Sequence, residues 1–386
     1  MKIIADTNIP YVRECFSAIG EVEVYSGREM TPSVVSDADV LLVRSITPVN
    51  SNLLAGSKVR FVGTVTIGFD HIDIEYLTRN NIGFASAPGS NANSAAEYVI
   101  AALLEIAHKH NITLEGKSLG IIGVGNVGRK VAEKASSLGM RVKLNDPPLQ
   151  RQTRDMKYLP LGELYDCDFI TLHTPLTFEG VDRTFHLADE KFFKSLKKGS
   201  VFMNTSRGGV VETNALKAAI SSGQLRATAL DVWEDEPNID TELLEMIDIG
   251  TPHIAGYSLD GKISGMIMIY EAMCKYFGLE VEKRIEDFLP GPEVPEIVID
   301  DVESRQQEII RNTVQQVYPI NRDGFNTREI AMVPQEVRGK FFDDLRKNYP
   351  VRREFQNTRI ILADSVQRTA DSESIAEKLV GIGFKI

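Results

Sequence analysis

A glycine pattern near the middle of the chain most constrains the fold. Gly123, Gly125 and Gly128 form the spacing G-x-G-x-x-G between an apolar segment, 119–122, that predicts a strand and an amphipathic segment that predicts a helix. A second predicted strand ends at Asp146, so the whole stretch is typical of a βαβ unit. The first glycine permits a tight turn, the second lets the backbone approach a pyrophosphate, and the third lets helix and strand pack closely. The helix N-terminus presents free N–H groups to the phosphates, so the pattern predicts a dinucleotide site.

Asp146 indicates which dinucleotide binds. It follows Gly128 by 18 residues and stands at the end of the second predicted strand. A carboxylate at this position accepts hydrogen bonds from the adenosine ribose hydroxyls and repels a 2′-phosphate, which favours NAD over NADP. The alternative interpretation is a Rossmann-like unit that has lost its ligand.

The chain of 386 residues is longer than one hydrophobic core usually serves, so two or three domains are expected. Short apolar segments that alternate with helical or loop segments in the first ninety residues predict a parallel sheet with crossover helices. These candidate strands are 2–5, 22–25, 40–44, 61–64 and 83–86. Further candidate strands predict a doubly wound sheet over residues 93–254; they are 168–172, 201–204 and 227–231.

The C-terminal third predicts a return to the first domain and then a separate domain. An Ile- and Met-rich helical pattern from Tyr257 to about Leu289 is expected to cover the first sheet. A Pro- and Gly-rich linker, 290–295, follows it. Strands at 296–299 and 359–363 and helices at 302–318 and 372–381 then predict a small α+β domain. The expected domains are 1–92 with 255–289, then 93–254, then 290–386.

Two local signals predict helix boundaries. Ser94 and Glu97 have the spacing of a capping box and predict the start of a long apolar helix that runs to about Lys109. Pro147 and Pro148 directly after Asp146 are expected to stop regular structure.

Composition excludes several classes of protein. A net charge of −11 disfavours non-specific binding to nucleic acid and to anionic membranes. No apolar segment is long enough to span a bilayer, and the N-terminus lacks the apolar region of a signal peptide. Three cysteines without motif spacing indicate reduced thiols in the cytoplasm and no metal site.

Three residues after strand ends carry candidate chemistry: Arg207, Glu236 and His253. Hydride transfer from an alcohol to nicotinamide needs a base for the hydroxyl proton, and imidazole titrates in the right range. A carboxylate hydrogen-bonded to imidazolium orients the ring and stabilises its charge. A guanidinium can hold a carboxylate with two parallel N–H bonds. Each residue alone could be structural, but the three together beside a dinucleotide site predict a dehydrogenase.

The chain resembles the D-isomer-specific 2-hydroxyacid dehydrogenases over roughly its first 285 residues. The stretches that carry the resemblance are Gly68–Asp73, Ala92–Glu97, the glycine pattern, Asn204–Gly209, Asp231–Pro237 and Pro252–His253. The resemblance implies an α/β fold with a Rossmann NAD-binding domain and a flavodoxin-like substrate domain split between the N-terminal segment and a returning helix. It also implies that Arg207, Glu236 and His253 are the catalytic residues.

Within this family, further stretches resemble members that act on a small phosphorylated hydroxy acid and whose C-terminal domain forms a homodimer. These stretches are Val43–Asn50, Gly63–Asp70, Pro252–Ser258 and Tyr349–Glu354. The resemblance implies substrate contacts at Ser45, Thr66 and Tyr257. It implies cofactor contacts at the three glycines and at Asn126, Val127, Asp146, Thr174, Thr205, Ser206, Asp231 and Gly256. The candidates for holding the substrate phosphate are Arg44, Arg346, Arg352 and Arg353.

The expected reaction is oxidation at C2, in which His253 takes the hydroxyl proton, Arg207 holds the carboxylate and Glu236 keeps His253 basic. Two alternatives stay open. One is a sibling enzyme that acts on 3-phosphoglycerate or reduces hydroxypyruvate, and the other is a non-enzymatic protein that senses NAD on the same scaffold.

Overall fold

A computed structural model describes residues 1–300, 304–364 and 369–386 of the chain. The chain forms two compact units. The first contains residues 1–92 and 258–290, and the second contains residues 93–257 and 291–386.

The first unit is built on a five-stranded parallel sheet in the order β2-β1-β3-β4-β5. Its strands are β1 (Lys2–Asp6), β2 (Glu21–Tyr25), β3 (Val40–Val43), β4 (Phe61–Thr64) and β5 (Gly83–Ser86). This order is that of flavodoxin-like folds, so the predicted fold of the first unit is confirmed. The five predicted strands differ from the observed ones by at most one residue at either end.

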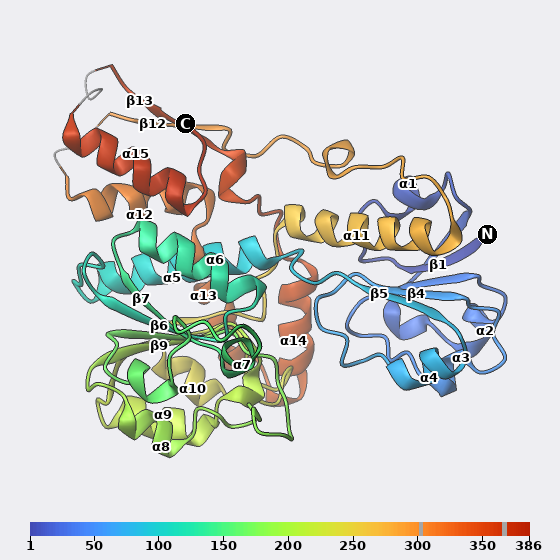
Figure 1. The fold of residues 1–386 in the computed structure, drawn as a ribbon, viewed down its shortest axis with the longest axis horizontal. Helices are drawn as coiled ribbons and strands as arrows, with labels where there is room; N and C mark the ends of the chain where they lie inside the picture. Colours follow the sequence, from blue (N-terminus) through green and yellow to red (C-terminus); the bar gives the residue numbers. More distant parts are fainter. Residues whose placement is uncertain (301–303, 365–368) are drawn as a thin grey trace. The chain divides into compact units, whose positions relative to one another are not determined.

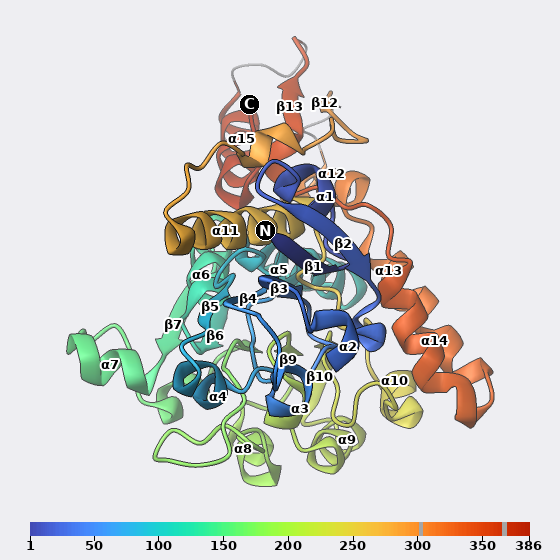
Figure 2. The same cartoon turned by 90° about the vertical axis from the view of Figure 1, so that its right-hand side faces the viewer.

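Helices cover both faces of this sheet because alternate side chains of its strands are apolar on both sides. Ile3 and Leu42 pack in one buried cluster, against α1 (Val12–Phe16) and α11 (Leu259–Phe277). Ile4 packs in the other cluster. Helices on that second face are α2 (Pro32–Val35), α3 (Ser51–Leu54) and α4 (Ile74–Arg79), as Figure 2 shows.

The returning helix is shorter than predicted. α11 ends at Phe277 because Gly278 adopts a left-handed conformation, with φ of 68°, and its N–H caps the helix. The expected extension to Leu289 is therefore wrong.

The second unit contains a six-stranded parallel sheet in the order β11-β10-β9-β8-β6-β7. Its strands are β6 (Ser118–Ile122), β7 (Arg141–Asn145), β8 (Phe169–Leu172), β9 (Ser200–Asn204), β10 (Leu225–Leu230) and β11 (Ile249–Gly250). Tyr158 makes a parallel bridge with Leu144 of β7 and takes the place of the outer strand of a Rossmann sheet. The strand order reverses between β6 and β8, and ligands of such sheets bind beyond the carboxyl ends of the strands at this point.

Helices α5 (Ala92–Lys109) and α6 (Asn126–Ser137) cover one face of this sheet (Figure 1). The opposite face is covered by α8 (Glu190–Ser195), α9 (Thr213–Ser221) and α10 (Thr241–Met246). A further helix, α7 (Pro147–Thr153), begins where the two prolines were expected to stop regular structure. Proline suits the first turn of a helix because the N–H that it lacks would have no partner within the helix.

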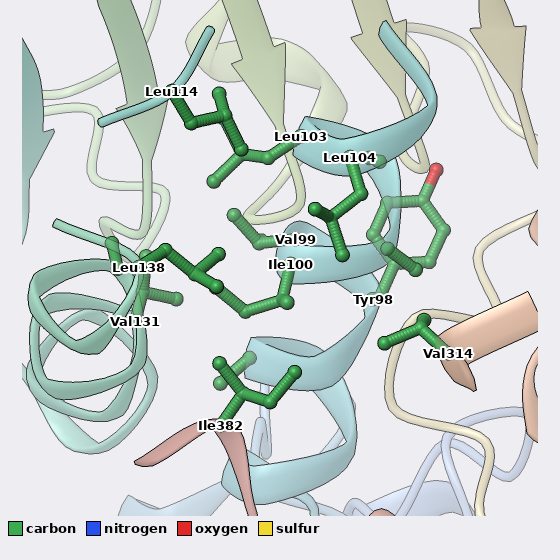
Figure 3. Close-up of a cluster of buried hydrophobic side chains, with 14 of the residues drawn as sticks. Tyr98, Val99, Ile100, Leu103, Leu104, Leu114, Val131, Leu138, Val314 and Ile382 are labelled. Atoms are coloured by element: carbon green, nitrogen blue, oxygen red, sulfur yellow. The ribbon is translucent and has the colours of Figure 1, made fainter. Parts of the chain in front are cut away.

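The C-terminal residues share a core with α5 and α6. Val314 and Ile382 pack against α5, whose residues Tyr98, Ile100 and Leu104 lie in the same cluster (Figure 3). The elements of this segment are β12 (Glu296–Ile299), α12 (Gln306–Val317), α13 (Ile320–Arg328), α14 (Gln335–Lys347), β13 (Arg359–Leu362) and α15 (Ala370–Ile382). Strands β12 and β13, which pair in parallel, and helices α12 and α15 were predicted as elements, whereas α13 and α14 were not. Positions 302 and 303 of the predicted helix 302–318 lie outside the described residues.

The contact with the C-terminal segment also explains why the capping-box prediction is wrong. α5 begins at Ala92, two residues before Ser94. The hydroxyl of Ser94 donates a hydrogen bond to Glu354 (2.8 Å), and the carboxylate of Glu97 accepts one from the N–H of Phe355 (2.9 Å). Both side chains therefore bind the C-terminal segment instead of capping their own helix.

Short 3-10 helices complete the elements: Gly27–Glu29, Leu161–Leu164, Gly208–Val210, Ile285–Asp287, Glu329–Met332 and Phe355–Asn357. Over the described ranges, no helix has the length and apolar character needed to cross a bilayer.

Candidate active site

The glycine turn has the geometry that a dinucleotide needs. Gly123 adopts φ of 87°, and a Cβ on Gly128 would lie 2.1 Å from the carbonyl oxygen of Gly123, so neither position tolerates a side chain. A Cβ on Gly125 would meet no atom within 4 Å, so the space beside this residue is open. Gly125 is the N-cap of α6 and no side chain caps the helix, which leaves its N-terminus available to an anion.

The loop that follows strand β8 lies on the same side of the sheet as the glycine turn. The loop after β8 passes close to the glycine turn, since a Cβ on Gly123 would lie 2.6 Å from the carbonyl oxygen of His173. The hydroxyl oxygen of Thr174 is buried and has no hydrogen-bond partner within the described part of the chain. A buried hydroxyl without a partner beside the open glycine turn fits a bound ligand, so the residues present fit NAD.

His173 has a structural environment. Its ring nitrogens lie 3.0 Å from the hydroxyl of Thr171 and 3.2 Å from that of Thr205. Burial lowers the pKa of His173 to about 3, so the ring is neutral at physiological pH.

Asp146 connects the glycine turn to the following helix. One carboxylate oxygen accepts the N–H of Val124 (2.8 Å), and the other accepts the N–H of Leu149 in the first turn of α7 (2.9 Å). These bonds fix the carboxylate at the end of β7, and each oxygen keeps acceptor capacity for a ribose hydroxyl.

Asp231 organises the loop that carries His253. Its carboxylate is buried and accepts hydrogen bonds from the N–H groups of Ile254 (2.7 Å) and Ala255 (2.9 Å) and from the hydroxyl of Thr251 (2.7 Å). The carbonyl oxygen of Asp231 accepts the N–H of His253 (2.7 Å). His253 itself has a positive φ of 57°, which the surrounding hydrogen bonds impose on a residue that rarely adopts it.

His253 and Glu236 form a hydrogen-bonded pair. Nδ1 of His253 lies 2.7 Å from Oε2 of Glu236, and Oε1 of Glu236 accepts the N–H of Trp233 (2.8 Å). Burial alone would raise the pKa of Glu236, but His253, the Trp233 N–H and the charge of Arg346 together hold this pKa below its ordinary value. Glu236 is therefore ionised at neutral pH, and the Nε2 side of the ring is left for a proton acceptor or donor role.

Arg207 lies in a loop that packs directly on the loop of Glu236. A Cβ on Gly208 would lie 1.8 Å from the carbonyl oxygen of Trp233, so the two backbones approach each other as closely as glycine permits. Nη1 of Arg207 donates to the carbonyl of Ser206 (2.7 Å), and the amide of Asn204 donates to the carbonyl of Arg207 (3.0 Å). The predicted catalytic residues thus lie on loops that are joined by specific contacts.

The remaining predicted positions divide between the two units. Tyr257 lies in the second unit, and the guanidinium of Arg346 from α14 lies 5.9 Å from the centre of its ring. Ser206 is buried and its hydroxyl donates to Asn204 (2.7 Å). Ser45 and Thr66 belong to the first unit, where they follow strands β3 and β4.

Sequence reasoning missed one residue that shapes this site, Trp233, and did not locate another, Arg346. Trp233 donates its indole N–H to the carbonyl of Thr251 (2.9 Å) and so ties the Glu236 loop to the His253 loop. It is the lone tryptophan of the chain and follows a strand end, which was a usable signal. Arg346 was considered for phosphate binding, but its place beside Glu236 and Tyr257 could not be inferred from sequence.

Comparisons with known proteins agree with this geometry. Residues 94–255 match the family model of the D-isomer specific 2-hydroxyacid dehydrogenase NAD binding domain, and residues 288–375 match a domain of unknown function. An erythronate-4-phosphate dehydrogenase of Escherichia fergusonii is 42% identical over 385 residues, which are 100% of this chain and 98% of the relative.

Solved structures with the same fold include dehydrogenases that contain NAD. An Entamoeba histolytica 3-phosphoglycerate dehydrogenase with bound NAD+ is 27% identical with a TM-score of 0.60, and covers 73% of this chain and 99% of its own. An Aquifex aeolicus D-lactate dehydrogenase with NAD and lactic acid is 26% identical with a TM-score of 0.57, and covers 72% of this chain and 94% of its own.

Proposed function

The chain belongs to the D-isomer specific 2-hydroxyacid dehydrogenase family, among its erythronate-4-phosphate dehydrogenases, and we propose that it oxidises 4-phospho-D-erythronate with NAD. The product is 2-oxo-3-hydroxy-4-phosphobutanoate, and the step serves the synthesis of pyridoxal 5′-phosphate. The observation that carries the proposal is the 2.7 Å hydrogen bond between His253 and Glu236, at the carboxyl ends of the same sheet that carries the open dinucleotide turn.

In the proposed mechanism, neutral His253 takes the proton of the C2 hydroxyl at Nε2. Glu236 holds the ring through Nδ1 and stabilises the imidazolium that forms. Arg207 binds the substrate carboxylate with parallel N–H bonds and so fixes the orientation of C2. NAD, when bound, would accept the hydride that leaves C2.

The cofactor is held by residues on the carboxyl side of the sheet. The α6 N-terminus, with Asn126 and Val127, would hold the pyrophosphate, and Asp146 would accept hydrogen bonds from the ribose hydroxyls. Thr174, Thr205, Ser206, Asp231 and Gly256 are the further proposed cofactor contacts. The substrate contacts proposed for this chain are Ser45, Thr66 and Tyr257.

The test is steady-state kinetics of the purified protein with NAD. We expect kcat/KM for 4-phospho-D-erythronate to exceed that for 3-phosphoglycerate and for glycerate. A preference for 3-phosphoglycerate, or efficient reduction of hydroxypyruvate, would assign a sibling activity. Tight binding of NADH without turnover of any of these acids would indicate an NAD-sensing protein and overturn the proposal.

We propose in addition that residues 290–386 form the dimerisation domain of a cytoplasmic homodimer. Large apolar side chains on this segment are exposed, among them Phe325 (69%), Met332 (85%) and Val351 (68%), as is common for a surface that a partner covers. The three cysteines are buried free thiols. Sedimentation velocity should give about twice the chain mass of 42.9 kDa, and a monomer mass at micromolar concentration would contradict the dimer.

A further inference from the structure

The four arginines considered for the substrate phosphate have different surroundings. Arg352 is buried with its guanidinium 4.1 Å from the ring centre of Tyr318. It donates to the carbonyls of Ala255 (2.7 Å) and Ser94 (3.2 Å), and its Nε and Nη1 have no hydrogen-bond partner within the described part of the chain. Arg353 is buried and donates to Asn357 (2.8 Å). Arg352 therefore joins the C-terminal segment to α5 and to the loop that follows His253, and Arg44 belongs to the first unit.

Arg346 lies near the end of α14, and its side chain shares the surroundings of the catalytic pair. Its guanidinium lies 5.9 Å from the ring centres of both Tyr257 and Phe342. It is also one of the charges that hold the pKa of Glu236 below its ordinary value. A helix of the C-terminal segment thus brings a cation to the residues that are proposed to bind and oxidise the substrate.

Among the described residues, Arg346 interacts with Tyr257 and still has one unused hydrogen-bond donor. Its Nε is buried and has no hydrogen-bond partner within the described part of the chain. The carboxylate of Asp343, one turn earlier in α14, lies 3.9 Å from Nη1, which is beyond hydrogen-bonding distance. A buried N–H of a guanidinium that has no partner is costly unless an anion completes its hydrogen bonding.

We propose that Arg346 binds the phosphate group of the substrate, and this inference rests on the proposed function. The substrate has an anion at each end, and Arg207 is assigned to the carboxylate. Arg346 is a second guanidinium in the same unit, and its planar fork of donors matches two phosphate oxygens. The segment that matched a domain of unknown function thereby completes the substrate site as well as forming the proposed dimer.

The first test compares a phosphorylated substrate with its unphosphorylated counterpart. For Arg346→Gln we expect kcat/KM for 4-phospho-D-erythronate to fall by roughly 10- to 100-fold, mainly through KM, because a charge-assisted hydrogen bond is lost. The fall with D-erythronate should be much smaller, so the preference for the phosphorylated acid declines. Arg346→Lys should keep part of the preference because the charge remains.

The matched control is Lys347→Gln, which removes the same charge from an exposed neighbouring residue of α14. This variant should keep the substrate preference of the wild type. Equal losses with both acids in Arg346→Gln would mean that Arg346 acts by positioning Glu236 or Tyr257, and would overturn the proposal. An unchanged preference would overturn it as well.

A second measurement separates this inference from the proposed function. Inorganic phosphate is titrated calorimetrically into the NAD complexes of the wild type and of Arg346→Gln, so that NAD fills the pyrophosphate site. We expect binding to the wild type and at least tenfold weaker binding to the variant, whichever acid the enzyme prefers. Equal affinity in the two proteins, or no binding to the wild type, would refute the assignment of Arg346.

Discussion

Replacing Glu236 by Gln tests the central pair of the site. Gln has the same size but a single acceptor oxygen, so the substitution removes the charge and one of the two hydrogen bonds that Glu236 accepts from Trp233 and His253. Oxidation requires a neutral imidazole, so its rate falls as pH decreases and His253 becomes protonated. Ionised Glu236 stabilises the imidazolium more than a neutral amide would. The limb should therefore move to lower pH in Glu236→Gln.

The size of the shift follows from the contact. A hydrogen bond to a charged group contributes about 1.5–3 kcal/mol, and the side chains of His253 and Glu236 are 34% and 21% exposed, so solvent screening favours the lower value. Because one pKa unit corresponds to about 1.36 kcal/mol, the limb should move by about 1 pH unit. The lowered pKa of Glu236 keeps its charge constant over the measured range, so its own titration does not obscure the result.

The assay is NADH absorbance with 4-phospho-D-erythronate between pH 5 and 10, analysed as kcat/KM against pH. Reduction of the oxo acid needs the imidazolium, so its alkaline limb should move in the same direction. Asp235→Asn is the matched control: it removes an exposed charge one residue away, and Asn tolerates the positive φ of 60° at this position. An acidic limb that stays in place in Glu236→Gln would refute the electrostatic role of Glu236.

Further substitutions test other parts of the site. His253→Ala should lower turnover by roughly two to four orders of magnitude while NADH fluorescence still reports binding, and a smaller loss would exclude general acid–base catalysis by this residue. Asp146→Asn should lower the ratio of kcat/KM for NAD to that for NADP by about tenfold, because a charge-assisted bond to ribose is lost and the repulsion of a 2′-phosphate is removed; an unchanged ratio would contradict this role. Gly208→Ala should lower the free energy of unfolding by about 1–3 kcal/mol, measured by urea denaturation, because its Cβ would lie 1.8 Å from the carbonyl of Trp233. The control is Gly162→Ala, whose Cβ would meet no atom within 4 Å and should leave stability nearly unchanged.

The parts of the fold that depend on local patterns were predictable. The turn at Gly123 requires a backbone conformation that glycine provides, and the strand before it, β6, is a short and mostly apolar segment with clear ends. The alternation of strands with helices then indicates a parallel sheet, whose carboxyl ends collect the site residues. The pairing of His253 with Glu236 agrees with this reasoning, because both follow strands of one sheet.

Features that depend on distant contacts were not predictable. Ser94 and Glu97 have the spacing of a helix cap, yet their partners are Glu354 and Phe355, about 260 residues further along the chain. Helix α13 contains Gly324 and several polar residues, so its apolar periodicity is weak and its formation depends on packing against strand β11. Pro147 shows a different limit, because a proline marks the start of a helix as readily as its end.

The contacts of Ser94 and Glu97 with the C-terminal segment bear on protein engineering. A chimera that grafts residues 291–386 onto a dehydrogenase without this segment would need a hydroxyl and a carboxylate at the positions of Ser94 and Glu97 to bond Glu354 and the N–H of Phe355. The graft would also bring apolar residues such as Ile382, which this chain buries against α5. Helix α5 and residues 291–386 therefore have to be transferred together, with the contacting residues of both kept.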